Sequence, residues 1–186
     1  MIDEIVIARA LTIQGWMTEP ELRWLAEQAT YHQAIAEIGC WKGRSTVVLA
    51  AHTSGRVWAI DHWQGQLADP AAGPSVEIVA RGTESIYEEF LANIAPWRAR
   101  VWIQREPSIV AACRLDVPLD FVFLDGAHDY AAVIADLCAY RPKLVAGGLL
   151  AGHDYSEYGR GKGVVRAVDE QLGPVNHIGD IWWRVL

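Results

Sequence analysis

Short apolar runs alternate along this chain with longer segments in which apolar residues recur at helical spacing. The first such segment opens at Thr18-Glu19-Pro20-Glu21, which has the form of a capping box. Apolar residues at i, i+3, i+4 and i+7 then predict a helix that begins near residue 19. These residues are Leu22, Leu25, Ala26 and Ala29.

From residue 33 onward, strands and helices are predicted to alternate five times. The apolar runs are short, as expected for strands that are buried on both faces of a sheet. The predicted strands cover residues 33–38, 57–60, 101–103, 121–124 and 149–151, and the predicted helices cover 45–51, 85–94, 108–113, 130–140 and 164–172.

Two further strand candidates, 175–178 and 181–185, are separated only by Gly179-Asp180 and are predicted to form a terminal hairpin. Repeated alternation of strand and helix favours parallel pairing, because parallel neighbours need a crossover connection. We therefore expect an α/β fold with a doubly wound sheet of about seven strands. The sheet should be mostly parallel, with an antiparallel C-terminal strand and helices on both faces.

The length of 186 residues, with 52% hydrophobic and 21% charged residues, suits one globular domain with a well-buried core. We interpret residues 1–186 as that single domain, with 1–32 as a helical N-terminal segment. The long connection over 62–83 has no clear element. It is either a lid over a binding site or a passive surface insertion.

Charge and composition exclude several classes of partner. The formal net charge is −7, and Lys and Arg form no cluster, so we expect no nucleic-acid partner. We see neither a signal peptide nor an apolar run approaching the roughly 18 residues of a membrane span. The three cysteines lack CxxC spacing and are interpreted as reduced core residues, which favours a cytoplasmic protein; they are Cys40, Cys113 and Cys138.

The turn after the first predicted strand contains two glycines, Gly39 and Gly43, at the opening of a helix. A dinucleotide fingerprint has glycines at its first, third and sixth positions, where the backbone meets a pyrophosphate. Here Trp41 and Arg44 occupy the third and sixth positions. This favours a ligand without a pyrophosphate, such as S-adenosylmethionine, over NAD or FAD.

Asp61 ends the second predicted strand, and His62 follows it. A carboxylate at this point can accept hydrogen bonds from both hydroxyls of an adenosine ribose. The alternative is that Asp61 only caps the following loop.

These features resemble the class I S-adenosylmethionine-dependent methyltransferases, which have a Rossmann-like fold. The similarity is to a small group that includes macrocin-type O-methyltransferases and cephalosporin hydroxylase, and it covers roughly residues 33–172. Besides the turn and Asp61, it rests on residues 123–130 (FLDGAHDY), 147–155 (GGLLAGHDY) and 163–168 (GVVRAV).

The resemblance implies a cofactor site across the first, second and fourth strands. Ser108 would lie near the adenine, Asp61 would hold the ribose, and Asp125 would close the pocket beside the sulfonium. The residues implied around the methionine end are Glu37, Gly39, Gly43 and Ser45.

Acceptor activation has two candidate mechanisms. Asp125 and Asp154 follow neighbouring predicted strands, and their carboxylates suit Mg²⁺, with His153 as a possible further ligand. The resemblance implies the same positions, because relatives that use a metal hold it with the two matching carboxylates. Without a metal, His128 or His153 would act as general base. The alternative is that Asp154 only caps its loop and His128 only orients its turn. Asp136 is expected to face solvent or pair with a base.

The resulting prediction is an O-methyltransferase for a small hydroxylated molecule such as a sugar, polyketide or phenol. Two alternatives are an NAD(P)-dependent oxidoreductase and a non-catalytic module that binds an adenosyl ligand. The Trp182-Trp183 pair suggests a homodimer face, although packing of an edge strand on its own helices would explain it equally well.

Overall fold

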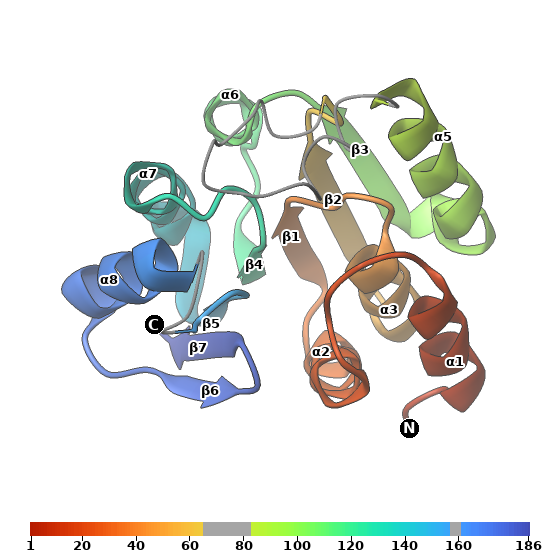
Figure 1. The fold of residues 1–186 in the computed structure, drawn as a ribbon, viewed down its shortest axis with the longest axis horizontal. Helices are drawn as coiled ribbons and strands as arrows, with labels where there is room; N and C mark the ends of the chain where they lie inside the picture. Colours follow the sequence, from red (N-terminus) through yellow and green to blue (C-terminus); the bar gives the residue numbers. More distant parts are fainter. Residues whose placement is uncertain (65–82, 157–160) are drawn as a thin grey trace.

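One mixed sheet runs through the centre of the protein, and its strands follow the order β3-β2-β1-β4-β5-β7-β6 (Figure 1). The computed structural model describes residues 1–64, 83–156 and 161–186. Within these ranges the strands are β1 (Ala34–Ile38), β2 (Arg56–Asp61), β3 (Val101–Arg105), β4 (Leu119–Leu124), β5 (Leu144–Gly152), β6 (Asn176–Ile178) and β7 (Ile181–Val185).

Five adjacent strands, from β3 to β5, pair in parallel, whereas β7 is antiparallel to both β5 and β6. The register aligns the carboxyl ends of the central strands: Ile38 lies opposite Ile60 on β2 and Leu124 on β4. The chain leaves β1 toward β2 on one side and returns to β4 on the other. This reversal of strand order is where doubly wound sheets bind ligands.

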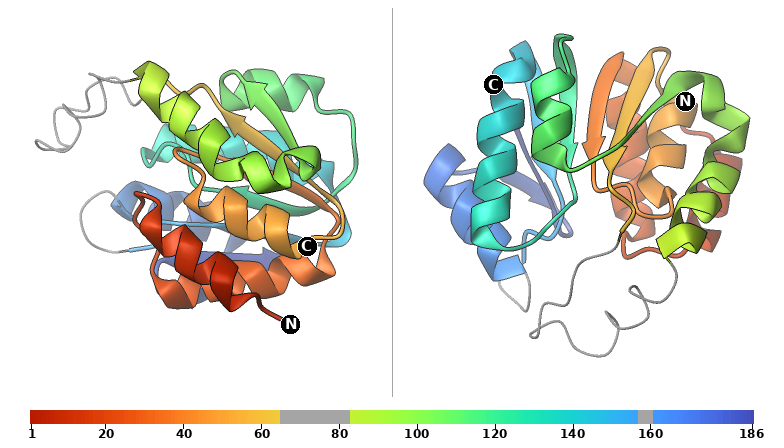
Figure 2. Two further views of the ribbon diagram at one scale, coloured as in Figure 1. Left: turned by 90° about the vertical axis from the view of Figure 1, so that its right-hand side faces the viewer. Right: turned by 90° about the horizontal axis from the view of Figure 1, so that it is seen from above.

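Helices cover both faces of the sheet over two separate hydrophobic clusters. The helices of the first face lie together in the left view of Figure 2, and those of the second face lie behind them. The first face carries α1 (Glu4–Thr12), α2 (Glu19–Tyr31), α3 (Arg44–His52) and α5 (Thr83–Ile94), and the second carries α6 (Ser108–Arg114), α7 (Tyr130–Tyr140) and α8 (Gly161–Leu172). Two short 3-10 helices, η1 (Ala95–Arg100) and η2 (Arg141–Lys143), follow α5 and α7.

The predicted α/β fold, the alternation and the terminal hairpin are confirmed, with β7 inserted between β5 and the edge strand β6. Helix α1 lies within the segment 1–32 that was expected to be helical, but it was not predicted as a separate element. It spans nine residues, and its N-terminus is capped by the Asp3 carboxylate, which accepts hydrogen bonds from the amides of Ile5 and Val6.

One prediction about burial needs correction. Of the three cysteines, only Cys40 is a buried core residue, because Cys113 and Cys138 are exposed. Trp182 is 1% exposed and packs within the second cluster, which favours the alternative that this strand packs on its own helices. The candidate lid lies almost entirely outside the described residues, which include only its ends at 62–64 and 83.

Among the helices described, none combines the length and the hydropathy needed to cross a bilayer.

Candidate functional site

A cavity of about 600 Å³ opens at the carboxyl ends of the central strands, a volume suited to an organic ligand of cofactor size. Every loop that follows β1 to β5 contributes to its wall, as does the connection between α1 and α2. The residues that line it include Gly39, Cys40, Trp41, Ser45, Asp61, His62, Trp63, Ser108, Asp125, His128, His153 and Asp154, together with Gln14 to Met17.

The turn after β1 is held between the two neighbouring strands. The amide of Gly39 donates to the Ile60 carbonyl over 2.9 Å, and the amide of Asp125 donates to the Ile38 carbonyl over 2.7 Å. Gly39 has a φ of 87°, and a Cβ there would lie 2.1 Å from the Asp125 carbonyl oxygen. Only glycine fits this position, which brings the first and fourth loops into contact at the cavity floor.

Glu37 supports this turn from behind. Its side chain is fully buried and accepts hydrogen bonds from the hydroxyls of Ser45 and Thr46, the latter over 2.5 Å. Burial raises the pKa of Glu37 to about 7, although the two hydroxyls act in the opposite direction. Of the four residues predicted around the methionine end, Gly39 and Ser45 line the cavity, whereas Glu37 and Gly43 are not among the described residues of its wall.

Asp61 lines the cavity and also holds two loops together. One carboxylate oxygen accepts from the amide of Trp41 over 2.9 Å, and the other accepts from the amide of Trp63 over 2.7 Å. The Trp63 indole NH in turn donates to the Trp41 carbonyl over 2.7 Å. The capping alternative therefore describes part of the role of Asp61, but a carboxylate has further lone pairs with which to accept ligand hydroxyls.

Trp41 carries two features that are typical of a ligand site. Its φ of 48° lies in the left-handed region, which is unfavourable for a bulky side chain. Its indole Nε1 is buried and has no hydrogen-bond partner among the described residues. Because a buried donor without a partner is costly, this NH is available to an acceptor atom of a bound ligand.

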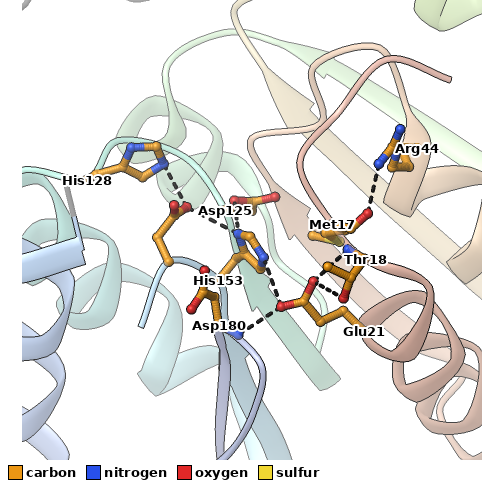
Figure 3. A network of polar contacts seen from close by, with 9 residues as sticks. Met17, Thr18, Glu21, Arg44, Asp125, His128, His153 and Asp180 are labelled. Atoms are coloured by element: carbon orange, nitrogen blue, oxygen red, sulfur yellow. Dashed lines mark hydrogen bonds and ion pairs between the residues drawn. The ribbon is translucent and has the colours of Figure 1, made fainter. Parts of the chain in front are cut away.

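Arg44 fastens the connection between α1 and α2 to the mouth of the cavity (Figure 3). Its guanidinium donates to the backbone carbonyls of Ile13 and Met17, each over 2.7 Å, and to that of Leu11 over 3.3 Å. Trp16 lies in this connection and is 70% exposed. The centroid of its ring is 5.8 Å from that of Trp41. The sequence analysis missed this wall. Its one local signal was an arginine at the sixth position of the turn, which was considered only as a departure from the dinucleotide pattern.

Ser108 lines the side of the cavity that follows β3. Its hydroxyl donates to the Asp136 carboxylate over 2.6 Å. Asp136 is only 6% exposed, so the prediction that it faces solvent or pairs with a base is wrong. Burial raises its pKa, although the Ser108 hydrogen bond lowers it.

A polar cluster lies at the ends of β4 and β5. Asp125, His128 and Asp154 have ligand atoms that all lie within 4.8 Å of one another, and Nε2 of His128 is 2.9 Å from Asp154 Oδ2. Two carboxylates and one imidazole fit a divalent cation such as Mg²⁺ or Mn²⁺. The histidine in this grouping is His128, whereas the sequence analysis had named His153 as the third ligand.

His153 lies beside the cluster, with both ring nitrogens directed at carboxylates (Figure 3). Nδ1 is 3.3 Å from Asp154 Oδ2 and 3.7 Å from Asp125 Oδ1, and Nε2 is 3.5 Å from Oε1 of Glu21 on α2. The ring is 6% exposed. Such an enclosed imidazole is poorly placed to reach a substrate proton, in contrast to the predicted role of His153 as a general base.

The charges of this group compensate one another. Burial raises the pKa of Asp125 to about 7, against the lowering effect of His153. Burial alone would lower the pKa of His153, but Asp125, Asp154 and Glu21 raise it to about 11. Hydrogen bonds from His128 and His153 outweigh burial at Asp154 and depress its pKa well below the usual range. A protonated His153 therefore balances part of the negative charge at neutral pH.

The strand order and a cavity at the carboxyl ends of β1, β2 and β4 define the Rossmann-like methyltransferase architecture. The chain belongs to the methyltransferase domain family, whose model matches residues 36–155, nearly two thirds of its length.

Solved structures support the same fold at low sequence identity. TomG from Streptomyces achromogenes, an O-methyltransferase of tomaymycin synthesis solved with SAM, is 15% identical with a TM-score of 0.69, and the match covers 98% of this chain and 90% of that one. Cofactor-bound Rv0187 from MTB is 18% identical with a TM-score of 0.67, over 98% and 90% of the two chains. The O-methyltransferase from Bacillus cereus in complex with SAH is 17% identical with a TM-score of 0.63, over 99% and 92%.

Proposed function

We propose that this protein is an S-adenosylmethionine-dependent O-methyltransferase that acts on a small hydroxylated molecule. The observation that carries the proposal is one cavity with two chemically different regions. A nucleoside-type region contains Asp61, and a reactive region contains Asp125, His128 and Asp154. Membership of the methyltransferase family supports the same cofactor, as do two of the similar solved structures, which are complexes with SAM and SAH.

The lining residues fit the parts of S-adenosylmethionine. Asp61 can accept hydrogen bonds from the ribose hydroxyls, with His62 adjacent, and the loop that contains Ser108 offers an apolar wall for the adenine. Gly39 directly follows β1, and Ser45 lies in the first turn of α3, where helix amides attract the carboxylate of the methionine end. The unpartnered Trp41 NH supplies one further donor.

The residues of the reactive region activate and align the acceptor. When bound, S-adenosylmethionine supplies a methyl group on a good leaving group, so catalysis depends chiefly on alignment and on loss of the acceptor proton. Asp125, His128 and Asp154 would hold a divalent cation that lowers the pKa of the acceptor hydroxyl. If no cation is used, His128 is the proton acceptor, and the Asp154 carboxylate 2.9 Å away orients its ring and stabilises its charged form.

The surroundings of this region favour an acceptor with a ring. Trp16, largely exposed at the mouth, presents a flat apolar surface beside Trp41. Phenols, polyketides and sugars can all lay a ring face against an indole.

The cofactor assignment is tested by ligand-induced stabilisation. We expect S-adenosylhomocysteine to raise the melting temperature, whereas NAD and NADP leave it unchanged, because stabilisation follows occupancy of the folded state. Asp61→Asn should weaken S-adenosylhomocysteine binding about tenfold or more, the typical worth of a hydrogen bond to a charged group.

The matched control is Asp116→Asn, an exposed carboxylate that precedes the amino end of β4. It should bind S-adenosylhomocysteine as the wild type does. Stabilisation by NAD but not by S-adenosylhomocysteine would transfer the assignment to the oxidoreductases. Tight binding without methyl transfer to any hydroxylated acceptor would indicate a binding module.

A further inference from the structure

Glu21 is a buried carboxylate with more partners than helix capping requires. It lies in the first turn of α2 and is 3% exposed. One oxygen, Oε2, completes the capping box by accepting from the Thr18 amide over 2.6 Å and from the Thr18 hydroxyl over 2.7 Å. A capping-box glutamate can do this at the protein surface, so burial of Glu21 calls for a further reason.

The second oxygen of Glu21 points away from its own helix. Oε1 accepts from the Asp180 amide over 2.8 Å and lies 3.5 Å from His153 Nε2 (Figure 3). The turn between β6 and β7 fits closely around it, because a Cβ on Gly179 would lie 2.5 Å from Oε1. The carboxylate is therefore fixed by contacts from α2, from the terminal hairpin and from the end of β5.

His153 connects this fixed carboxylate to the reactive cluster. Its Nε2 faces Glu21, and its Nδ1 faces both Asp125 and Asp154. Since an imidazole is planar and its two nitrogens point in different directions, holding one of them fixes the direction of the other.

We propose that Glu21 is a positioning residue, which orients His153 and through it holds Asp125 and Asp154 in the arrangement that binds a cation and activates the acceptor. The inference rests on the proposed function. Glu21 is absent from the described wall of the cavity, so it acts on the cluster and not on the cofactor. Without its carboxylate, the imidazole can rotate and the two aspartates lose their common partner.

The test compares two variants at the capping box that differ at Oε1. Glu21→Gln keeps the size of the side chain and changes the group that faces His153. Thr18→Ala removes the hydroxyl contact to Oε2 and leaves Oε1 in place. Both are expected to lower the melting temperature, because each removes a contact at the start of α2.

The measured quantities are the dissociation constants of Mn²⁺ and of S-adenosylhomocysteine, and the ring ¹⁵N NMR shifts of His153 and His128. We expect Glu21→Gln to weaken Mn²⁺ binding about tenfold or more, as loss of an outer partner of metal ligands typically does. It should shift both histidine signals and change S-adenosylhomocysteine affinity less than about twofold. Thr18→Ala should leave all of these unchanged.

Each other outcome has a defined meaning. If Glu21→Gln shifts only the His153 signal and leaves His128 and Mn²⁺ binding as in the wild type, Glu21 is a structural tie and the proposal is overturned. If wild-type protein binds no S-adenosylhomocysteine, the proposed function fails, while the NMR comparison still decides the positioning role. Should Glu21→Gln not fold, Glu21→Asp, which keeps the charge but shortens the reach to His153, must give the same pattern.

Discussion

Replacement of Glu37 by Gln should make the protein more stable at neutral and alkaline pH. Glu37 is fully buried at the end of β1, and its contacts are the neutral hydroxyls of Ser45 and Thr46. Burial therefore raises its pKa from the ordinary 4.5 to about 7. Gln has nearly the same shape, carries no charge, and still offers a carbonyl oxygen to one of the hydroxyls.

The size of the effect follows from the two pKa values. Between pH 4.5 and about 7 the folded protein retains a proton on Glu37 that the unfolded chain has released. Stability therefore falls as pH rises through this interval and stays lower above it. At about 1.4 kcal/mol per pH unit, the full loss is about 3 kcal/mol, all of it absent from the Gln variant.

Urea unfolding at pH 5, 6, 7 and 8 provides the assay. The free energy of unfolding of Glu37→Gln minus that of the wild type should grow by about 2.5 kcal/mol from pH 5 to pH 8, because part of the full loss has already occurred at pH 5. The control is Glu27→Gln on the exposed side of α2, for which the difference should not change with pH. A difference for Glu37→Gln that is equally flat would refute the argument, because Glu37 would then be ionised in its buried position at no cost.

Two other substitutions test the walls of the site. Arg44→Lys replaces a guanidinium that donates to three carbonyls with a single ammonium, which cannot make all three contacts. Chymotryptic cleavage after Trp16 should therefore accelerate several-fold, and the affinity for S-adenosylhomocysteine should fall. Cleavage at the wild-type rate would show that Arg44 does not hold this connection. His128→Gln should reduce methyl transfer about 100-fold with little change in cofactor affinity, and titration with Mg²⁺ separates its two roles. Partial recovery of the rate at high Mg²⁺ indicates a metal ligand. Loss of the acidic limb of the pH profile, where the rate rises as the base loses its proton, indicates a base, and an unchanged rate removes His128 from the reaction.

The sequence predicted the sheet and the location of the site because both depend on local patterns. The strands β1 to β4, of five or six residues, are largely apolar, and the polar residue that follows or ends the apolar run is visible without a structure. Asp61 and Asp125 were found in this way, and parallel pairing brings them to one edge of the sheet. Asp154 was found in the same way, because it follows the apolar run of β5, which pairs with β4.

The directions of the side chains were predicted less well than the sheet and the location of the site. Glu37 was expected to contact the cofactor, but the alternation of β1 directs it toward α3, opposite to the direction of its neighbour Ile38. At the end of β5 the chain enters a positive φ of 60° at Asp154, which lets this side chain meet His128 and leaves His153 enclosed. No periodicity in the sequence indicates that change of direction.

The N-terminal segment illustrates the second limit, because its importance comes from contacts between distant parts of the chain. From the sequence, residues 1–32 were interpreted only as helices that precede the first strand. In the structure, Arg44 ties the backbone before α2 to the mouth of the cavity, and Glu21, one turn further on, reaches His153 at its reactive region. Both sets of contacts involve the same short stretch, residues 11–21. A displacement of this stretch therefore affects both the mouth of the cavity and the cluster that contains His153. Substitutions that loosen the packing of α1 or α2 without changing the lining of the cavity should therefore lower the turnover of methyl transfer before they lower the affinity for S-adenosylhomocysteine.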